Sequence, residues 1–230
     1  MRITILKYLL LSVIFIFISF ESASAREWVD TNTWLGEGQT VTRFFSVLGD
    51  RCRLHYLNHG PGALRIQVFN REHEEVYEIY TRRNVPGIRT IPMAGDYYLK
   101  VEPENARWEV TVRQRLSQGE LWRLRQQVLE FRQSQEKIAS FSGESGRFTY
   151  PLSVAGDSWR IVYSNNREGN LRIRVRETGT SDYLFDRSLD SPTRTDTWVH
   201  DAGEFELQVE AGETRWRVDI YQVDQTEEQP

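Results

Sequence analysis

The sequence of 230 residues holds a single cysteine, Cys52. One thiol excludes a framework of intramolecular disulfides, so each folded domain must be stabilised by its own hydrophobic core. Lysine is also scarce, with Lys7, Lys100 and Lys137 as the only examples, and 33 acidic residues outnumber 29 basic ones to give a formal net charge of −4. This charge balance does not favour nucleic acid as a partner.

Motifs of cofactor chemistry are missing as well. The sequence has no glycine loop that would cradle a phosphate, no dinucleotide-binding fingerprint and no calcium-binding loop. His55 and His59 are four residues apart, a spacing that aligns two zinc ligands on a helix, but they fall on a predicted strand and the turn after it. We therefore predict no cofactor, no bound metal and no catalytic residue.

Long apolar runs are confined to the start of the chain. Leu9–Phe20 is apolar, Arg2 and Lys7 precede it, and the small residues Ala23-Ser24-Ala25 follow it. This order is typical of a secretory signal peptide with cleavage after Ala25. The run is shorter than the roughly 20 residues that a membrane-spanning helix needs. We expect residues 1–25 to be removed, and the mature chain to be periplasmic or secreted without a membrane span.

What the chain does contain is a repeat. Residues 94–114 read AGDYYLKVEPENARWEVTVRQ and residues 202–222 read AGEFELQVEAGETRWRVDIYQ, with no gap between the two and nine of twenty-one positions identical. Similarity at a fixed spacing indicates a duplicated structural unit. The shared residues include Trp108 and Trp216, and each copy has the pattern of a β-hairpin.

The duplication extends upstream at an offset of 107 residues. Residues 33–37, 46–50 and 64–68 match residues 140–144, 153–157 and 171–175. The repeated units therefore run from about Thr33 to Gln114 and from about Ser140 to Gln222. We predict a first domain over 26–114, a second over 140–222, and a disordered acidic tail over 223–230.

Inside each unit the apolar residues have a period of two. Cys52, Leu54 and Tyr56 alternate with polar residues, as do Trp159 and Ile161 in the second copy. Such alternation predicts strands with one buried face, and turn signals separate about seven of them in each unit. The sequence thus predicts an all-β protein with two tandem antiparallel β-sandwiches of jelly-roll-like type. Cys52 matches Trp159, so we interpret it as a buried core residue.

The period changes between the two units. Apolar residues there form a single helical stripe: Leu121, Leu124, Val128, Phe131 and Ile138. Ser117 and Glu120 stand three apart immediately before it, as in a capping box. We predict an amphipathic linker helix over 115–139 that packs on the two domains. The alternative is a homodimer formed through this helix, over 117–138.

Most tryptophans are in phase with core positions, but three are not: Trp28, Trp122 and Trp198. Trp198 is out of phase with Val199, and the first copy has Thr90 in its place. An unmatched tryptophan that points outward is a candidate for contact with a ligand. We take Trp198 and Trp28 as candidate ligand-binding residues; the alternative for Trp198 is that the linker helix covers it.

Three motifs of the repeat resemble a known kind of module. They are an aromatic-x-Gly-Glu start, a Ser-Val-x-Gly-Asp turn, and an Ala-Gly-[Asp/Glu]-[Tyr/Phe]-x-Leu-x-Val segment that leads to Trp-x-Val. The pattern resembles small bacterial extracytoplasmic β-sandwich modules, similar to the pre-peptidase C-terminal and CUB-like groups, over 33–114 and 140–222. The resemblance implies a β-sandwich and a non-catalytic role in adhesion, targeting or ligand binding.

The sequence leads to two functional hypotheses. The first is a non-catalytic exported binding or scaffolding protein of the bacterial cell envelope, whose partner is an envelope protein or a glycan. The second is an enzyme with a site between the two units. For the second, the unmatched polar residues His73, His200 and Asp201 should converge in one cleft.

Overall fold

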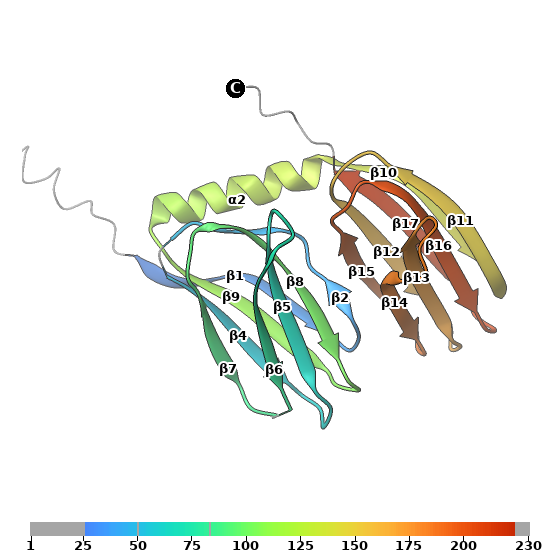
Figure 1. Cartoon of the computed structure of the whole chain (residues 1–230), viewed down its shortest axis with the longest axis horizontal. Helices are drawn as coiled ribbons and strands as arrows, with labels where there is room; N and C mark the ends of the chain where they lie inside the picture. Colours follow the sequence, from blue (N-terminus) through green and yellow to red (C-terminus); the bar gives the residue numbers. More distant parts are fainter. Residues whose placement is uncertain (1–25, 50, 83, 224–230) are drawn as a thin grey trace, which may run out of the picture.

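The structure, a computed structural model, describes residues 26–49, 51–82 and 84–223. The predicted signal peptide and residues 224–230 of the predicted tail lie outside the described residues. The part of the chain described is an all-β protein of two antiparallel sandwiches joined by one helix (Figure 1). No helix in that part is both long and apolar enough to cross a membrane.

The first sandwich consists of two sheets. Its strands are β1 (Glu27–Gly36), β2 (Thr40–Val41), β3 (Phe45–Val47), β4 (Cys52–Asn58), β5 (Leu64–Asn70), β6 (Glu75–Thr81), β7 (Gly87–Ile91), β8 (Gly95–Pro103) and β9 (Trp108–Leu116). One sheet has the order β1-β9-β4-β7, and the other has the order β2-β8-β5-β6 with β3 also paired to β8.

The second sandwich repeats this arrangement. Its strands are β10 (Gln135–Gly143), β11 (Gly146–Val154), β12 (Trp159–Asn165), β13 (Leu171–Glu177), β14 (Tyr183–Leu189), β15 (Thr193–Val199), β16 (Gly203–Ala211) and β17 (Trp216–Val223). Its sheets have the orders β10-β17-β12-β15 and β11-β16-β13-β14. Counted within the domain these are 1-8-3-6 and 2-7-4-5, a jelly roll. The fold class predicted from the sequence is confirmed, with eight strands rather than seven in this domain.

The duplication begins earlier than the sequence indicated, because both first strands carry the same irregularity. The register between β1 and β9 shifts at Thr31, and the register between β10 and β17 shifts at Ile138. These two positions are 107 residues apart, the offset of the repeat. A β-bulge of this kind bends the strand locally. The repeat unit therefore includes the bulge at the start of each domain.

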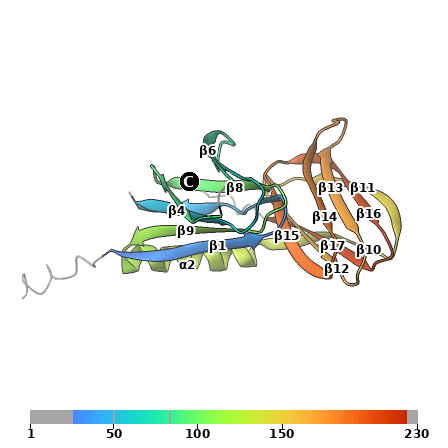
Figure 2. The same ribbon diagram turned by 90° about the horizontal axis from the view of Figure 1, so that it is seen from below.

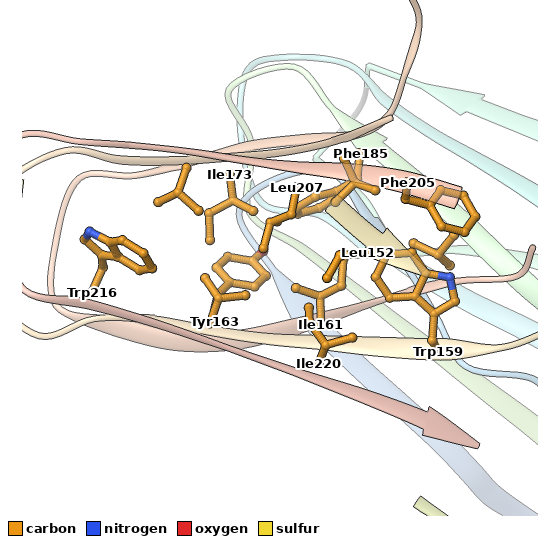
Figure 3. Close-up of a cluster of buried hydrophobic side chains, with 14 of the residues drawn as sticks. Leu152, Trp159, Ile161, Tyr163, Ile173, Phe185, Phe205, Leu207, Trp216 and Ile220 are labelled. Atoms are coloured by element: carbon orange, nitrogen blue, oxygen red, sulfur yellow. The ribbon is translucent and has the colours of Figure 1, made fainter. Parts of the chain in front are cut away.

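Each sandwich has its own core between its two sheets. Figure 3 shows part of the core of the second domain, where Trp159 packs against Phe205 of the opposite sheet while Tyr163 and Trp216 lie toward the other end of the cluster. In the first domain Cys52 is fully buried among the core residues, as its match to Trp159 predicted. The two core clusters share no residue. Each domain thus has a hydrophobic interior of its own.

Helix α2 (Gln118–Gln133) links the sandwiches and runs across one end of the first (Figure 1). The predicted capping box is present: the Ser117 hydroxyl accepts the Glu120 amide proton, and the Glu120 carboxylate accepts that of Ser117. The predicted extension of the helix to residue 139 is wrong. From Gln135 the chain pairs with β17, so Ile138 lies in a strand and is 38% exposed.

Candidate functional site

The two domains meet where a strand of the first is interrupted. In β2 and β3, Thr40 pairs with Val101 and Phe45 pairs with Tyr97. The chain therefore advances five residues from Thr40 to Phe45 while the partner strand β8 advances only four. The equivalent strand of the second domain, β11, runs without interruption along β16. The extra residue makes a bulge at residues 42–44. This bulge turns toward the second domain, which lies beside the first in both views (Figure 2).

His200 joins the bulge to the second domain. Its Nε2 donates to the carbonyl oxygen of Thr42 at 2.8 Å, since a carbonyl can only accept. That assignment leaves Nδ1 as the acceptor for the hydroxyl of Ser158, at 2.7 Å. His200 is 4% exposed. Burial lowers the pKa of His200 to about 4, although the bond to the Thr42 carbonyl opposes that shift.

Strand β15 of the second domain adds two contacts to the edge of β2. The Val41 amide donates to the hydroxyl of Thr197 at 3.1 Å, and the Thr40 hydroxyl donates to the carbonyl oxygen of Asp196 at 3.4 Å. An exposed edge strand presents unpaired backbone groups that favour association. Here the second domain covers part of such an edge on the first.

Aromatic rings continue the contact on both sides of His200. The ring of Tyr98 lies 4.4 Å from that of His200 and stacks on Phe69, while Phe44 approaches His200 at 4.3 Å. On the other side Trp198 packs against Phe131 of α2, with 5.3 Å between centroids. Offset and edge-to-face ring pairs at these distances are stabilising. The interface is therefore an aromatic one, with His200 at its centre.

A groove lies beside this interface, beneath the helix. It has a volume of about 1010 Å³ and is lined by the inner face of α2, by residues 29–32 of β1, by residues 43–46 before and within β3, and by the turn before β12. Leu121, Leu124, Val128 and Phe131 face it from the helix. All four are only partly buried. The apolar stripe predicted from the sequence is thus not fully covered by the sandwiches.

The rim of the groove is polar and carries charges of both signs. Arg71 lies 3.5 Å from Asp96, and Arg125 and Asp157 also belong to the lining. Arg43 places its guanidinium 5.6 Å from the centre of the Phe131 ring. An apolar floor with a few polar groups around it is the usual composition of a binding site.

The two tryptophans predicted to bind a ligand lie in different surroundings. Trp198 points outward from its sheet but is only 5% exposed, because Phe131 of the helix covers it. It is therefore unavailable to a ligand, and that prediction is corrected. Trp28 is partly buried beneath Arg53, whose guanidinium lies 4.3 Å from its ring centre. For Trp28 a ligand role stays a prediction.

Two of the three polar residues named for an enzyme site do come together. His73 Nδ1 lies 3.3 Å from the Tyr98 hydroxyl, and Tyr98 contacts His200. Asp201 follows His200 in the chain and is exposed. Burial raises the pKa of Asp201, while the charge of His73 opposes this shift. Ser158 and Tyr98, which complete the cluster, were not predicted; neither carries a local motif, and only the docking of the domains brings them together.

Helix α2 also exposes two large apolar side chains, of which Trp122 lies outside the groove lining and Leu129 within it. Trp122 is 62% exposed and Leu129 is 48% exposed, seven residues apart on the helix. The predicted homodimer through this helix stays a prediction. It would use Trp122, which lies outside the groove lining, because Leu124 and Leu129 both belong to that lining.

Comparison with known proteins does not name a family. No family model matches the sequence, and no curated protein matches it. Among solved structures, a conserved protein of unknown function from Pseudomonas aeruginosa PAO1 is 10% identical over 83% of this chain and 78% of its own, with a TM-score of 0.28. The PBSX exported protein XepA is 6% identical over 85% of each chain, with a TM-score of 0.29. A cupin 2 conserved barrel domain protein from Leptotrichia buccalis is 13% identical over 90% of this chain and 94% of its own, with a TM-score of 0.22.

Proposed function

We propose that the protein is a non-catalytic exported binding protein of the cell envelope that takes an extended peptide segment of a partner protein in the groove beneath α2. The observation that carries the proposal is the apolar face of α2. Leu124 and Val128 line a volume of about 1010 Å³ and remain partly exposed within it. Apolar surface left open in a concave site favours binding of an apolar group.

A peptide suits the groove better than a purely apolar ligand does. Residues 29–32 lie on β1, an edge strand that pairs with β9 on one side, and Phe45 and Ser46 lie on the edge strand β3. Edge strands offer backbone donors and acceptors, which a bound peptide satisfies with its own backbone. The Ser46 carbonyl already accepts from Gln114 Nε2 at 2.8 Å, but an acyl chain would leave the other backbone groups of these edges that lack a protein partner unsatisfied, at a cost in free energy.

The hypothesis of an enzyme is a second candidate, because Ser158 and His73 line the groove and contact His200 and Tyr98 beside it. A serine activated by histidine is a common nucleophile. In this protein, however, Nε2 of His200 is bonded to Thr42 and the imidazole is buried with a pKa lowered to about 4. A general base works best with a pKa near the operating pH. These properties support a role for the pair in holding the domains together.

Selection from a random peptide library displayed on phage, with residues 26–230 as the target, tests the peptide hypothesis. Enriched peptides should carry alternating apolar residues and bind with a Kd in the micromolar range. Leu124→Glu places a charge on the floor of the groove and should weaken binding about ten-fold or more. Selection that enriches no common sequence would contradict the proposal.

Gln126→Glu is the matched control, because it puts the same side chain on the same helix at a position outside the groove lining. Both variants should keep the circular dichroism spectrum of the parent. Equal losses of affinity in the two variants would place the peptide elsewhere. Loss of an esterase activity in the variant Ser158→Ala would favour the second candidate, the enzyme.

A further inference from the structure

The second domain has a hollow of its own, which shares no lining residue with the groove. It has a volume of about 620 Å³ and lies on the outward face of the sheet formed by β10, β17, β12 and β15. Ser164 on β12 and Tyr221 on β17 belong to its lining and alternate with the core residues Tyr163 and Ile220. Of the eleven lining residues only Val162 and Pro192 are aliphatic. The hollow is thus polar, unlike the groove.

The floor of the hollow is a buried carboxylate held by three donors. Asp219 is 5% exposed and accepts from the Ser140 hydroxyl at 2.7 Å and from Arg217 Nε at 2.9 Å, while Lys137 Nζ lies 3.3 Å away. Burial opposes ionisation of Asp219, but these hydrogen bonds outweigh it and lower its pKa. The carboxylate is therefore ionised and fixed in place.

One carboxylate cannot neutralise the cations around it. Lys137 and Arg217 share Asp219, and Arg194 on β15 adds a third positive charge, so the lining carries a net charge of +2. The whole chain has a formal net charge of −4. A local excess of one sign against the net charge of the protein favours a ligand of the opposite sign.

The first domain lacks this charge at the equivalent positions. By strand register Lys137 corresponds to Asp30 and Arg217 to Glu109, while Asp219 corresponds to Thr111. The jelly roll does not need the basic residues, since the first copy folds without them. Lys137 and Arg217 also hold the buried Asp219, so the exposed Arg194 is the cation that points to a role outside folding.

We propose that this hollow binds an acidic oligosaccharide, with its carboxylate or sulfate group on Arg194 and Lys137. A small inorganic anion would need a narrow cradle, whereas this site is broad and open. Around the cations lie hydroxyl and amide groups on Ser164, Asn166 and Thr193, which suit the many hydroxyls of a sugar. The ring of Tyr221 is half-buried, with Lys137 Nζ 5.4 Å from its centre, and its exposed part offers an apolar contact for the C–H face of a sugar ring.

Isothermal titration calorimetry of residues 26–230 with defined probes tests this proposal. Tetragalacturonic acid carries carboxylates, a heparin tetrasaccharide carries sulfates, maltotetraose is neutral, and inorganic phosphate is a simple anion. At least one of the two acidic sugars should bind, and its affinity should fall as salt is raised. Equal affinity for maltotetraose would overturn the role of charge, and equal affinity for phosphate would overturn the role of the sugar.

Variants locate the site. Arg194→Gln removes an exposed cation from the hollow and should weaken the acidic sugar about ten-fold, as expected for loss of one charged hydrogen bond. The control Arg147→Gln removes an exposed arginine from the other sheet of the same domain and should have no effect. If both variants bind like the parent, or both lose equally, the hollow is not the site. Leu124→Glu should leave sugar binding unchanged, which separates this test from that of the groove.

Discussion

Phe69 and Tyr98 stack with their ring centroids 5.0 Å apart, at the register position where the second domain places Arg176 opposite Glu206. In the second domain the pair is a surface salt bridge, with the Arg176 side chain 29% exposed. In the first domain the equivalent pair is apolar and Tyr98 is covered by His200. The substitution of an ion pair by two rings therefore marks the surface on which the second domain docks.

Introducing this ion pair into the first domain should separate the second domain from it. The double variant Phe69→Arg and Tyr98→Glu places charges where His200 and Phe44 now pack, and removes buried aromatic contacts worth about 3 kcal/mol or more. Small-angle X-ray scattering should show a larger radius of gyration. The near-ultraviolet circular dichroism spectrum, which reports the packing of the aromatic core residues, should persist. The control is Lys100→Gln, which also replaces a residue on this sheet face with its counterpart in the second domain. It should leave the scattering curve unchanged. An unchanged curve for the double variant would mean that other contacts hold the domains.

The duplicated parts of the molecule were predictable from the sequence, because their signals are local and occur twice. Alternating apolar residues predicted the strands, and the match of Cys52 to Trp159 identified a core position. The capping box at Ser117 gave the start of the helix. Its end was missed, since Ile138 continues the apolar stripe of the helix but is the bulged residue of β10, between Lys137 and Ala139, which pair with β17.

The candidate site could not be predicted in the same way, because it depends on how the two copies meet. Trp198 points outward as its phase indicated, yet Phe131 from a distant segment covers it. The contact between His200 and Thr42 joins residues 158 positions apart and uses a bulge that leaves no periodic signal. The comparison of the two copies did predict that functional residues lie where the copies differ. His200 and Ser158 are such residues.

Protonation of His200 should loosen the domain interface in mild acid. Its pKa in the folded protein is about 4, below the value of about 6.5 expected in the unfolded chain, so the unfolded chain binds more protons between these values. Stability should therefore fall as the pH drops from about 6.5 to about 4, by up to about 3 kcal/mol, with no further change from this group below pH 4. His73 lies nearby and adds to the effect, whereas Asp157 opposes it.

Urea unfolding between pH 4 and pH 7 measures this effect when the parent is compared with His200→Gln. The amide of glutamine can donate to Thr42 and does not titrate, so the difference in stability between the two proteins should change across this pH range. A constant difference would show that His200 does not contribute to the pH dependence.

Gly143 should not tolerate a side chain. A Cβ atom there would lie 2.8 Å from Cζ2 of Trp216, and the equivalent Gly36 has the same relation to Trp108 at 2.6 Å. Gly143→Ala should cost about 1–3 kcal/mol by overpacking and lower the Tm of the second domain by several degrees. Calorimetry measures the shift. Gly119→Ala is the control, since nothing lies within 4 Å of its added Cβ in the helix; an equal loss in both variants would rule out the contact with Trp216 as the cause.

The thiol of Cys52 should report the opening of the first domain alone. It is fully buried, and burial raises its pKa to about 12, so the native thiol is both protonated and inaccessible. Iodoacetamide at pH 8 should not label the native protein, and labelling should begin at the urea concentration where the first domain unfolds. The two cores share no residue. Gly143→Ala should therefore lower the urea concentration at which the second domain unfolds, without lowering equally the urea concentration at which Cys52 is labelled. If both urea concentrations fall by the same amount, the interface around His200 couples the two domains into one cooperative unit, and the duplicated sandwiches do not unfold independently.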